Sequence, residues 1–168
     1  MKTEWMGRYR SFVAAIVKHS NLYSKVSNRK TIEYKDFHLT HVEWQILEYL
    51  LENPENDGNM KAVSEALGIV ASSFSKYVAN LAKYGLVEKY MAEGNQKNII
   101  LRISEDGCRC YDQIVTTQMR AVFEDTFRIL DALSDQELMI VENAIKALKY
   151  IDTEQKEYKI KKKLIKVH

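Results

Sequence analysis

The sequence predicts a mainly α-helical protein of six helices with one small β-hairpin, arranged as a helix-turn-helix followed by a hairpin wing. Apolar residues recur every three or four positions through much of the chain, and its 168 residues include one proline and six glycines, so little interrupts the helices. Two short helical patterns, 60–67 and 72–84, precede two apolar runs that flank a polar turn. At this length we expect one domain, residues 1–168, with a substantial core.

The pattern begins with a helix over residues 4–27, whose apolar positions include Trp5, Tyr9 and Phe12. Residues 28–38 are polar and irregular, and we expect them to be a connector. Thr40 and Glu43 form a capping box, in which each side chain satisfies a backbone N–H of the other residue. The second helix therefore begins there, and it ends before Pro54.

The helix-turn-helix and the wing follow, and with the second helix they form a lobe over residues 39–104. Asn59 can cap the helix at 60–67, which ends at Gly68. Gly85 is suited to the left-handed conformation that ends the helix at 72–84. Strands are expected at 86–92 and 98–103, around a polar turn at 93–97.

Ser104 can cap a long fifth helix that runs to about Leu133, and Ser134 with Glu137 forms a second capping box that opens a sixth. A helix near 28 residues is about 42 Å long, which exceeds a small domain. Its apolar stripe must be buried against something, as must that of the first helix. The terminal helices, 4–27 and 105–151, are therefore predicted to form a homodimer; the alternative is that they cover each other within one chain.

Charge is unevenly distributed along the chain, whose formal net charge is +2. Residues 72–102 hold five basic and two acidic side chains, a net charge of +3, whereas 39–71 carries −5 and 103–151 carries −4. A local basic region is where a polyanion docks. The alternative is that these charges only solvate exposed faces. The basic tail at 152–168 could contact DNA or a partner, or it could be solvated.

Short hydrogen-bonding side chains and one long cation gather in the fourth helix, while Phe74, Val78 and Leu81 are expected to pack inward. Such groups bind phosphates and base edges in a major groove. The candidate residues are Ser72, Ser73, Ser75, Lys76 and Asn80, and from the hairpin Lys89, Asn95, Gln96 and Lys97. The alternative is an ordinary polar helix face and an ordinary exposed hairpin.

Three motifs resemble the MarR (multiple antibiotic resistance regulator) family: Leu39-Thr40, Gly85-Leu86-Val87, and Ile103-Ser104-Glu105-Asp106-Gly107. The resemblance covers nearly the whole chain. It implies a homodimeric winged-helix transcription factor, commonly a repressor that small phenolic or lipophilic ligands release from pseudo-palindromic double-stranded DNA. Its recognition helix would enter the major groove, and its wing would lie on the minor groove or the backbone.

The wing departs from that family's pattern. Where the family usually has Asp-x-Arg, this chain has Asn95 and Lys97. Asn95 cannot form the ion pair that orients the arginine, and lysine lacks the planar, bidentate fork. Specificity should therefore depend mainly on the recognition helix. A second hypothesis follows, in which the chain is a winged-helix module that binds protein, with weak or no DNA specificity.

The resemblance also implies a ligand crevice between the dimer helices and the DNA-reading lobe. Its candidate lining residues are aromatic or imidazole side chains: Tyr9, Phe12, Tyr34, Phe37, His38 and Trp44. The alternative is that they pack in the core or in the dimer interface.

Other functions find little support in the sequence. It has no catalytic or nucleotide-binding motif, so we expect neither an enzyme nor a cofactor. His38, His41 and Glu43 are a weak metal pattern, and no metal site is predicted. Cys108 and Cys110 are poorly placed for a disulfide with each other, and redox sensing through them is a minor alternative. Without a signal or membrane segment, a cytoplasmic protein is expected.

Overall fold

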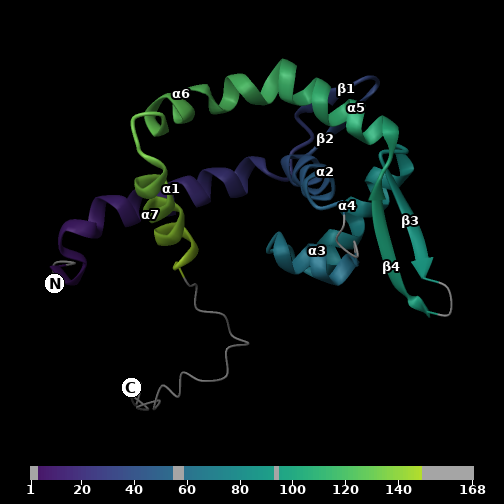
Figure 1. The fold of residues 1–168 in the computed structure, drawn as a ribbon, viewed down its shortest axis with the longest axis horizontal. Coiled ribbons are helices and arrows are strands. Elements are labelled where there is room, and N and C mark those ends of the chain that lie inside the picture. Colours follow the sequence, from purple (N-terminus) through teal and green to yellow (C-terminus); the bar gives the residue numbers. More distant parts are fainter. Residues whose placement is uncertain (1–3, 55–58, 93–94, 149–168) are drawn as a thin grey trace, which may run out of the picture. The chain divides into compact units, whose positions relative to one another are not determined.

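The computed structural model describes residues 4–54, 59–92 and 95–148, without the side chains of Glu4 and of residues 92–98. It divides into two compact units, residues 1–122 and 123–168 (Figure 1). The basic tail predicted at 152–168 lies outside the described residues. Among those that are described, no helix is both long and apolar enough to cross a membrane.

The N-terminal segment is a 3₁₀ helix, η1 (Glu4–Tyr9), followed by α1 (Arg10–Val26), and not the single helix expected over 4–27. Gly7 causes the difference, because its φ of 49° and ψ of −133° are not helical. No residue of α1 is buried. The Tyr23 hydroxyl donates a hydrogen bond to Gln45 Oε1 at 2.9 Å, which joins α1 to the helix that follows.

Residues 28–38 were expected to be an irregular connector, and this prediction is wrong in part. Two strands, β1 (Ile32–Tyr34) and β2 (Phe37–Leu39), form an antiparallel hairpin with Ile32 paired to Leu39. Ile32, Tyr34 and Leu39 are buried, and Lys35 turns the chain with a φ of 48°. Strands of three residues are too short to show an alternating pattern in the sequence.

Three helices form the helix-turn-helix lobe: α2 (His41–Glu52), α3 (Met60–Ala66) and α4 (Ala71–Lys83). The capping box of α2 is confirmed, since the Thr40 hydroxyl accepts from Glu43 N and the Glu43 carboxylate accepts from Thr40 N. Asn59 caps α3 as predicted, by accepting from Lys61 N at 2.8 Å. Gly85 follows α4 with a φ of 70°, as its left-handed role requires.

The core of the first unit lies among α2, α4, the two hairpins and α5 (Glu105–Ile114). Its fully buried side chains come from all of these elements, which are far apart in sequence. The largest of them are Phe74, Leu39, Ile46, Leu47, Leu81, Leu86, Leu101 and Ile114. Burial of eighteen apolar side chains in one cluster is what positions α4 and the wing.

The wing is an antiparallel hairpin of β3 (Val87–Ala92) and β4 (Asn95–Ile103), with Val87 paired to Ile103. Because β4 begins at residue 95, the connection between the strands is shorter than the five-residue turn expected. The register shifts between Met91 and Ala92, near the tip. An isolated bridge between Asn59 and Ile100 ties the start of α3 to the wing.

The long fifth helix exists, but its middle is a π-helical segment. It consists of α5, η2 (Val115–Met119) and α6 (Arg120–Leu130). Gln118, within η2, holds the backbone of β1: its Nε2 donates to Glu33 O at 2.9 Å, and Glu33 N donates to its Oε1 at 3.3 Å. The π segment therefore coincides with a contact to β1 and lies just before the boundary between the units.

The second unit contains the C-terminal part of α6 and α7 (Asp135–Lys146). The predicted capping box at Ser134 and Glu137 is confirmed. Neither α6 nor α7 has a buried residue. Large apolar side chains are instead exposed, among them Phe127 at 54%, Ile129 at 72% and Ile140 at 68%. These side chains belong to the apolar stripes that the sequence predicts on the terminal helices.

Gly107, in the first turn of α5, provides a test of this packing. A Cβ there would lie 2.2 Å from the Leu86 carbonyl oxygen and 2.7 Å from Ile103 Cγ1. We expect Gly107→Ala to lower the free energy of unfolding by about 1–3 kcal/mol, although alanine is the better helix former. Urea denaturation at one protein concentration measures this. Gln113→Ala, exposed on the same helix, should stay within about 0.5 kcal/mol of the wild type; equal stability of the two variants would contradict the packing argument.

Candidate nucleic-acid interface

The first half of α4 presents a polar face because its apolar face is fixed in the core. Phe74, Val78 and Leu81 are no more than 1% exposed, which confirms their predicted inward orientation. Ser72, Ser75 and Lys76 are exposed, whereas Ser73 is half-buried. The helix therefore holds these groups outward on a rigid base, as base recognition requires.

Asn80, another candidate DNA-contacting residue, is less exposed than Ser72 and Lys76. Its side chain is half-buried and its Nδ2 donates to Glu43 Oε1 at 3.0 Å. Glu43 itself is fully buried. The amide thus connects α4 to the start of α2.

The exposed polar side chains of α4 differ in whether they already form a hydrogen bond within the protein. The Ser75 hydroxyl donates to Ala71 O at 3.0 Å within the helix, so its proton is already used. Ser72 and Lys76 form no hydrogen bond or ion pair with the described residues. These two side chains are therefore the ones most available to an external ligand.

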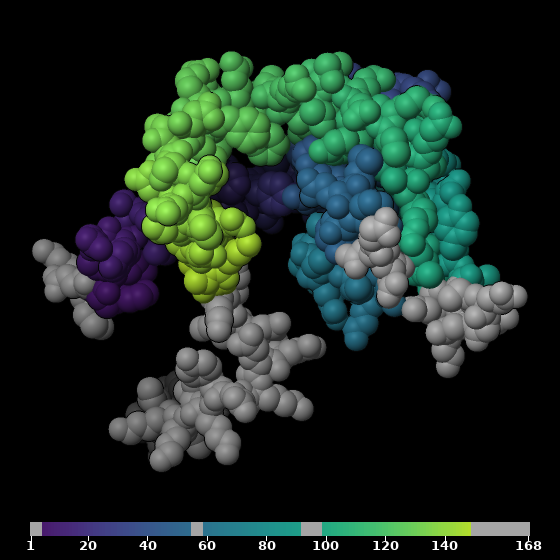
Figure 2. All heavy atoms as spheres, viewed as in Figure 1, coloured from purple at the N-terminus to yellow at the C-terminus, as the bar shows by residue number. Residues whose placement is uncertain are grey.

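The wing contributes fewer described residues than the sequence suggested. The side chains of Asn95, Gln96 and Lys97 lie outside the described residues. Lys89 is exposed on β3, opposite the buried Leu101 of β4. The hairpin, teal at the right of the view, extends away from α2 and α4 (Figures 1 and 2).

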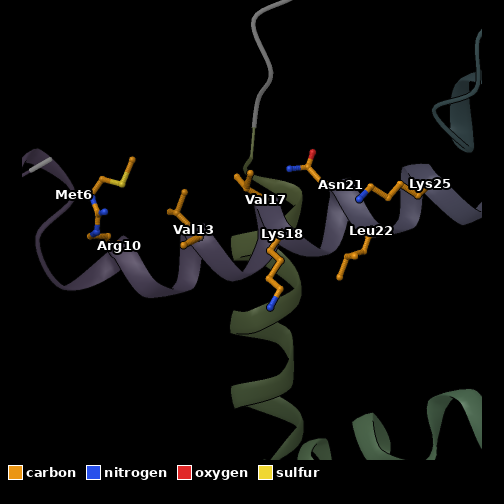
Figure 3. Close-up of a pocket in the computed structure, with 9 residues that line it drawn as sticks. Met6, Arg10, Val13, Val17, Lys18, Asn21, Leu22 and Lys25 are labelled. Atoms are coloured by element: carbon orange, nitrogen blue, oxygen red, sulfur yellow. The ribbon is translucent and has the colours of Figure 1, made fainter.

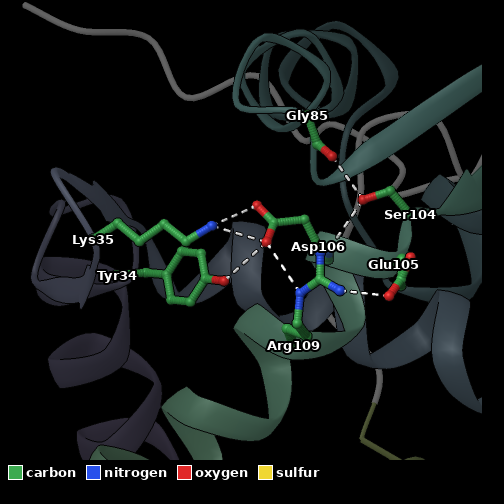
Figure 4. A network of polar contacts seen from close by, with 8 residues as sticks. Tyr34, Lys35, Gly85, Ser104, Glu105, Asp106 and Arg109 are labelled. Atoms are coloured by element: carbon green, nitrogen blue, oxygen red, sulfur yellow. Dashed lines mark hydrogen bonds and ion pairs between the residues drawn. The ribbon is translucent and has the colours of Figure 1, made fainter.

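A polar network fixes the corner where the wing meets α5 (Figure 4). The Ser104 hydroxyl donates to Gly85 O at 2.6 Å and accepts from Gly107 N at 2.9 Å. One serine thus caps α5 and binds the turn that follows α4. The orientation of the wing relative to the recognition helix therefore depends on Ser104.

Asp106 joins the β1–β2 hairpin to the same corner. Lys35 Nζ donates to its two carboxylate oxygens at 2.8 and 2.9 Å, and the Tyr34 hydroxyl donates to Oδ1 at 3.2 Å (Figure 4). Arg109 Nε also contacts Oδ1, at 3.4 Å. The Lys35 ammonium group, assisted by these donors, holds the pKa of the Asp106 carboxyl below its usual range.

The predicted ligand-lining residues fall into separate contacts in this chain. Tyr34 is buried and packs edge-on against Phe37, whose ring stacks on Tyr84 with centroids 4.1 Å apart. Tyr9 and Phe12 are 60% and 42% exposed on η1 and α1. His38 is exposed, with Nε2 3.6 Å from a carboxylate oxygen of Glu33.

Trp44 is the most distinctive member of that set. Its ring stacks on Tyr111 of α5, with centroids 5.7 Å apart, and the Tyr111 hydroxyl donates to Glu48 Oε1. Burial, aided by that carboxylate, raises the pKa of Tyr111 to about 12. The Trp44 indole N–H is buried and, among the residues described, has no hydrogen-bond acceptor.

A shallow groove of about 530 Å³ lies elsewhere, along η1 and α1 (Figure 3). Its lining mixes apolar residues such as Met6, Val13 and Val17 with the cations Arg10 and Lys18. Every lining residue belongs to this one helical segment. The groove is thus an uncovered face of α1 and does not contain the six predicted ligand-lining residues.

The cysteines and the metal pattern do not add a site. Cys110 is fully buried, and burial raises the pKa of its thiol to about 12, which opposes redox reactivity. In the described part of the chain, no group of three or more His, Cys, Asp or Glu side chains is placed to hold a metal ion.

Known proteins resemble this chain in structure and not in sequence. No protein-family model matches it, and no curated protein matches it in sequence. The chain is similar to the Streptomyces coelicolor PcaV transcriptional regulator in complex with its natural ligand (TM-score 0.55, 17% identity), over 84% of this chain and 92% of that one. It is also similar to the S. aureus MepR–DNA complex (TM-score 0.56, 15% identity, 82% and 93% covered). A third match is Lactococcus lactis ZitR, a zinc-responsive MarR family member (TM-score 0.54, 12% identity, 82% and 94% covered). The fold is thus that of MarR-type winged-helix regulators.

Two features of this surface were missed by sequence reasoning. Val70, the N-cap residue directly before α4, is 71% exposed. Asp106 was noted only as part of a motif, although it anchors the first hairpin. The signal for Val70 was available, since an apolar residue occupies a position where helices prefer a polar cap.

The Asp106 network predicts a specific pH dependence. A carboxyl whose pKa is depressed on folding stabilises the fold above its unfolded pKa of about 3.9, and this contribution is lost as the pH falls through the folded value. We expect Asp106→Asn to be less stable than the wild type at pH 7, by a difference that narrows from pH 5 toward pH 3. Chemical denaturation across this range measures it. Asp112→Asn, exposed on the same helix, is the matched control; a gap for Asp106→Asn that does not change with pH would refute the role given to Lys35.

Proposed function

We propose that the chain is a homodimeric, sequence-specific DNA-binding transcriptional regulator, a repressor that a small-molecule ligand releases. In this proposal α4 enters the major groove and the wing lies on the minor groove or the backbone. The observation that carries it is the outward face of α4, where Ser72 and Lys76 are free while the opposite face is fixed in the core.

Charge and structural similarity support DNA as the partner. The recognition helix and the wing lie in the basic stretch 72–102, between two acidic stretches, so a polyanion is attracted there locally. A MepR structure with this fold was solved as a DNA complex. The PcaV structure contains that protein's natural ligand, which supports a small-molecule effector here.

The uncovered helices support a homodimer. In α1, α6 and α7 no residue is buried, although all three have large exposed apolar side chains. From Arg10 to Val26, α1 carries three cations and no acidic residue, whereas residues 123–148 carry six acidic and two basic side chains. Apolar faces with opposite charges are suited to contact each other across a two-fold axis. Two copies of α4 would then meet half-sites about one helical turn apart.

Trp44 is the residue through which we propose that a ligand acts. Its N–H is a buried donor without an acceptor, it stacks on Tyr111 of α5, and α5 continues into the proposed dimer helices. A ligand that accepts a hydrogen bond from this N–H would therefore change the position of α5, which connects the DNA-reading lobe to the proposed dimer helices.

Replacement of Lys76 tests the DNA interface. If Lys76 contacts a phosphate, Lys76→Ala should weaken binding to all duplexes and reduce the slope of log K against log salt by about 0.9. Fluorescence anisotropy with the protein's own upstream DNA, at several salt concentrations, measures both quantities. Arg29→Ala, which removes one exposed positive charge outside α4, the wing and the proposed dimer helices, should leave the slope unchanged. The absence of salt-dependent DNA binding would exclude this function and favour the protein-binding alternative.

Insertion of a charge tests the dimer. Ile140→Glu places a carboxylate on the exposed apolar face of α7, and in a two-fold interface each dimer loses two isoleucine contacts. At about 1.5 kcal/mol or more for each, the dimer dissociation constant should rise about a hundredfold. Sedimentation velocity over a concentration series measures it, and Asn143→Glu on the same helix controls for charge alone. If the wild-type protein is monomeric while its helices remain folded, the proposed dimer is wrong.

A further inference from the structure

The start of α4 presents an apolar side chain to solvent. Val70 is 71% exposed, whereas Val78, on the same helix, is fully buried. Ala71, the next residue, is exposed as well. The leading edge of the recognition helix is therefore apolar, and the polar groups Ser72 and Lys76 follow it.

Val70 occupies a position that favours a polar side chain. It is the N-cap of α4, with φ of −59° and ψ of 132°, and no side chain caps this helix. Asn59 has nearly the same backbone conformation, φ of −58° and ψ of 126°, and it caps α3. Valine is among the poorest N-cap residues. Asparagine at position 70 would thus stabilise the N-terminus of α4 more than valine does, so helix capping does not explain the valine.

The chemistry of the major groove supplies one. In helix-turn-helix proteins the N-terminal residues of the recognition helix reach the base edges. Among the groups that base pairs present in the major groove, the apolar one is the C5 methyl of thymine. The Ser75 hydroxyl already donates its proton to Ala71 O, so it is not a free hydrogen-bond donor to a base edge.

We propose that Val70 reads the C5 methyl group of a thymine in each DNA half-site, with Ala71 beside it. This inference rests on the proposed DNA-binding function and extends it to part of the recognised sequence. Val70 is then a specificity-determining residue whose poor capping is retained because its apolar side chain contacts the base.

The test is a double-mutant cycle that combines one substitution in the protein with one change in the DNA. The purified full chain first selects its tightest duplex from a random-sequence pool, and each thymine is then replaced by uracil, which lacks the methyl group. At one thymine in each half-site, uracil should weaken binding to the wild type about fourfold, the value of one buried methyl-sized group. Val70→Ala changes both subunits, so on the thymine duplex it should lose about as much as the wild type loses when both thymines are replaced, about sixteenfold, and show no further loss with uracil. Thr31→Ala, which shortens another exposed β-branched side chain before β1 and outside the proposed dimer helices, should keep the full uracil effect.

A second variant separates recognition from folding. Val70→Asn should raise the melting temperature by about 2–4 °C through a cap like that of Asn59, yet weaken DNA binding. A purely structural residue would not move stability and affinity in opposite directions. If the chain binds DNA in a salt-dependent manner but no thymine-to-uracil change couples to Val70, this inference is wrong and the proposed function stands. If no duplex is selected, both are wrong.

Discussion

The buried carboxyl group of Glu43 is the constraint on which the helix-turn-helix lobe depends. Its Oε2 accepts from the backbone N–H and the hydroxyl of Thr40, and its Oε1 accepts from Asn80. The capping box of α2 is thereby joined to the middle of α4. A buried acceptor left without a donor costs about 1–3 kcal/mol, so α4 cannot rotate about its axis without a large loss. The direction in which Ser72 and Lys76 face is accordingly set from inside the protein.

Elements with local chemical signals could be predicted from the sequence. Both capping boxes, the Asn59 cap and the turn at Gly85 are short-range arrangements of side chain and backbone, and each one is present. The helix-turn-helix and the wing followed from these signals and from the apolar periodicity. Their agreement with one another is what made the fold predictable from a single sequence.

The remaining features depend on contacts between distant residues. Asn80 lies 37 positions from Glu43, and Lys35 lies 71 from Asp106. A polar residue on a helix gives no sign in the sequence of whether its partner is a buried carboxylate or a base. The β1–β2 hairpin was missed for a related reason, because its short strands are held by Gln118 and Asp106 from the far end of the lobe. For the candidate site, local sequence therefore identified the helix but not which of its polar residues face outward.

The two units differ in what they need from a partner. The first unit buries eighteen apolar side chains, whereas no residue of α6 or α7 is buried. The first unit is therefore stiff by its own packing, and under the proposed function the terminal helices bury their apolar faces against a second copy of the chain. Under the proposed function, a ligand near Trp44 does not need to reshape α4, which Glu43 and Asn80 hold in place. The ligand needs only to change the direction in which α5 continues, through the π-helical segment η2, into the proposed dimer helices. In the proposed dimer, that direction sets the distance between the two copies of α4. Release from DNA then follows from a change in spacing between two rigid readers.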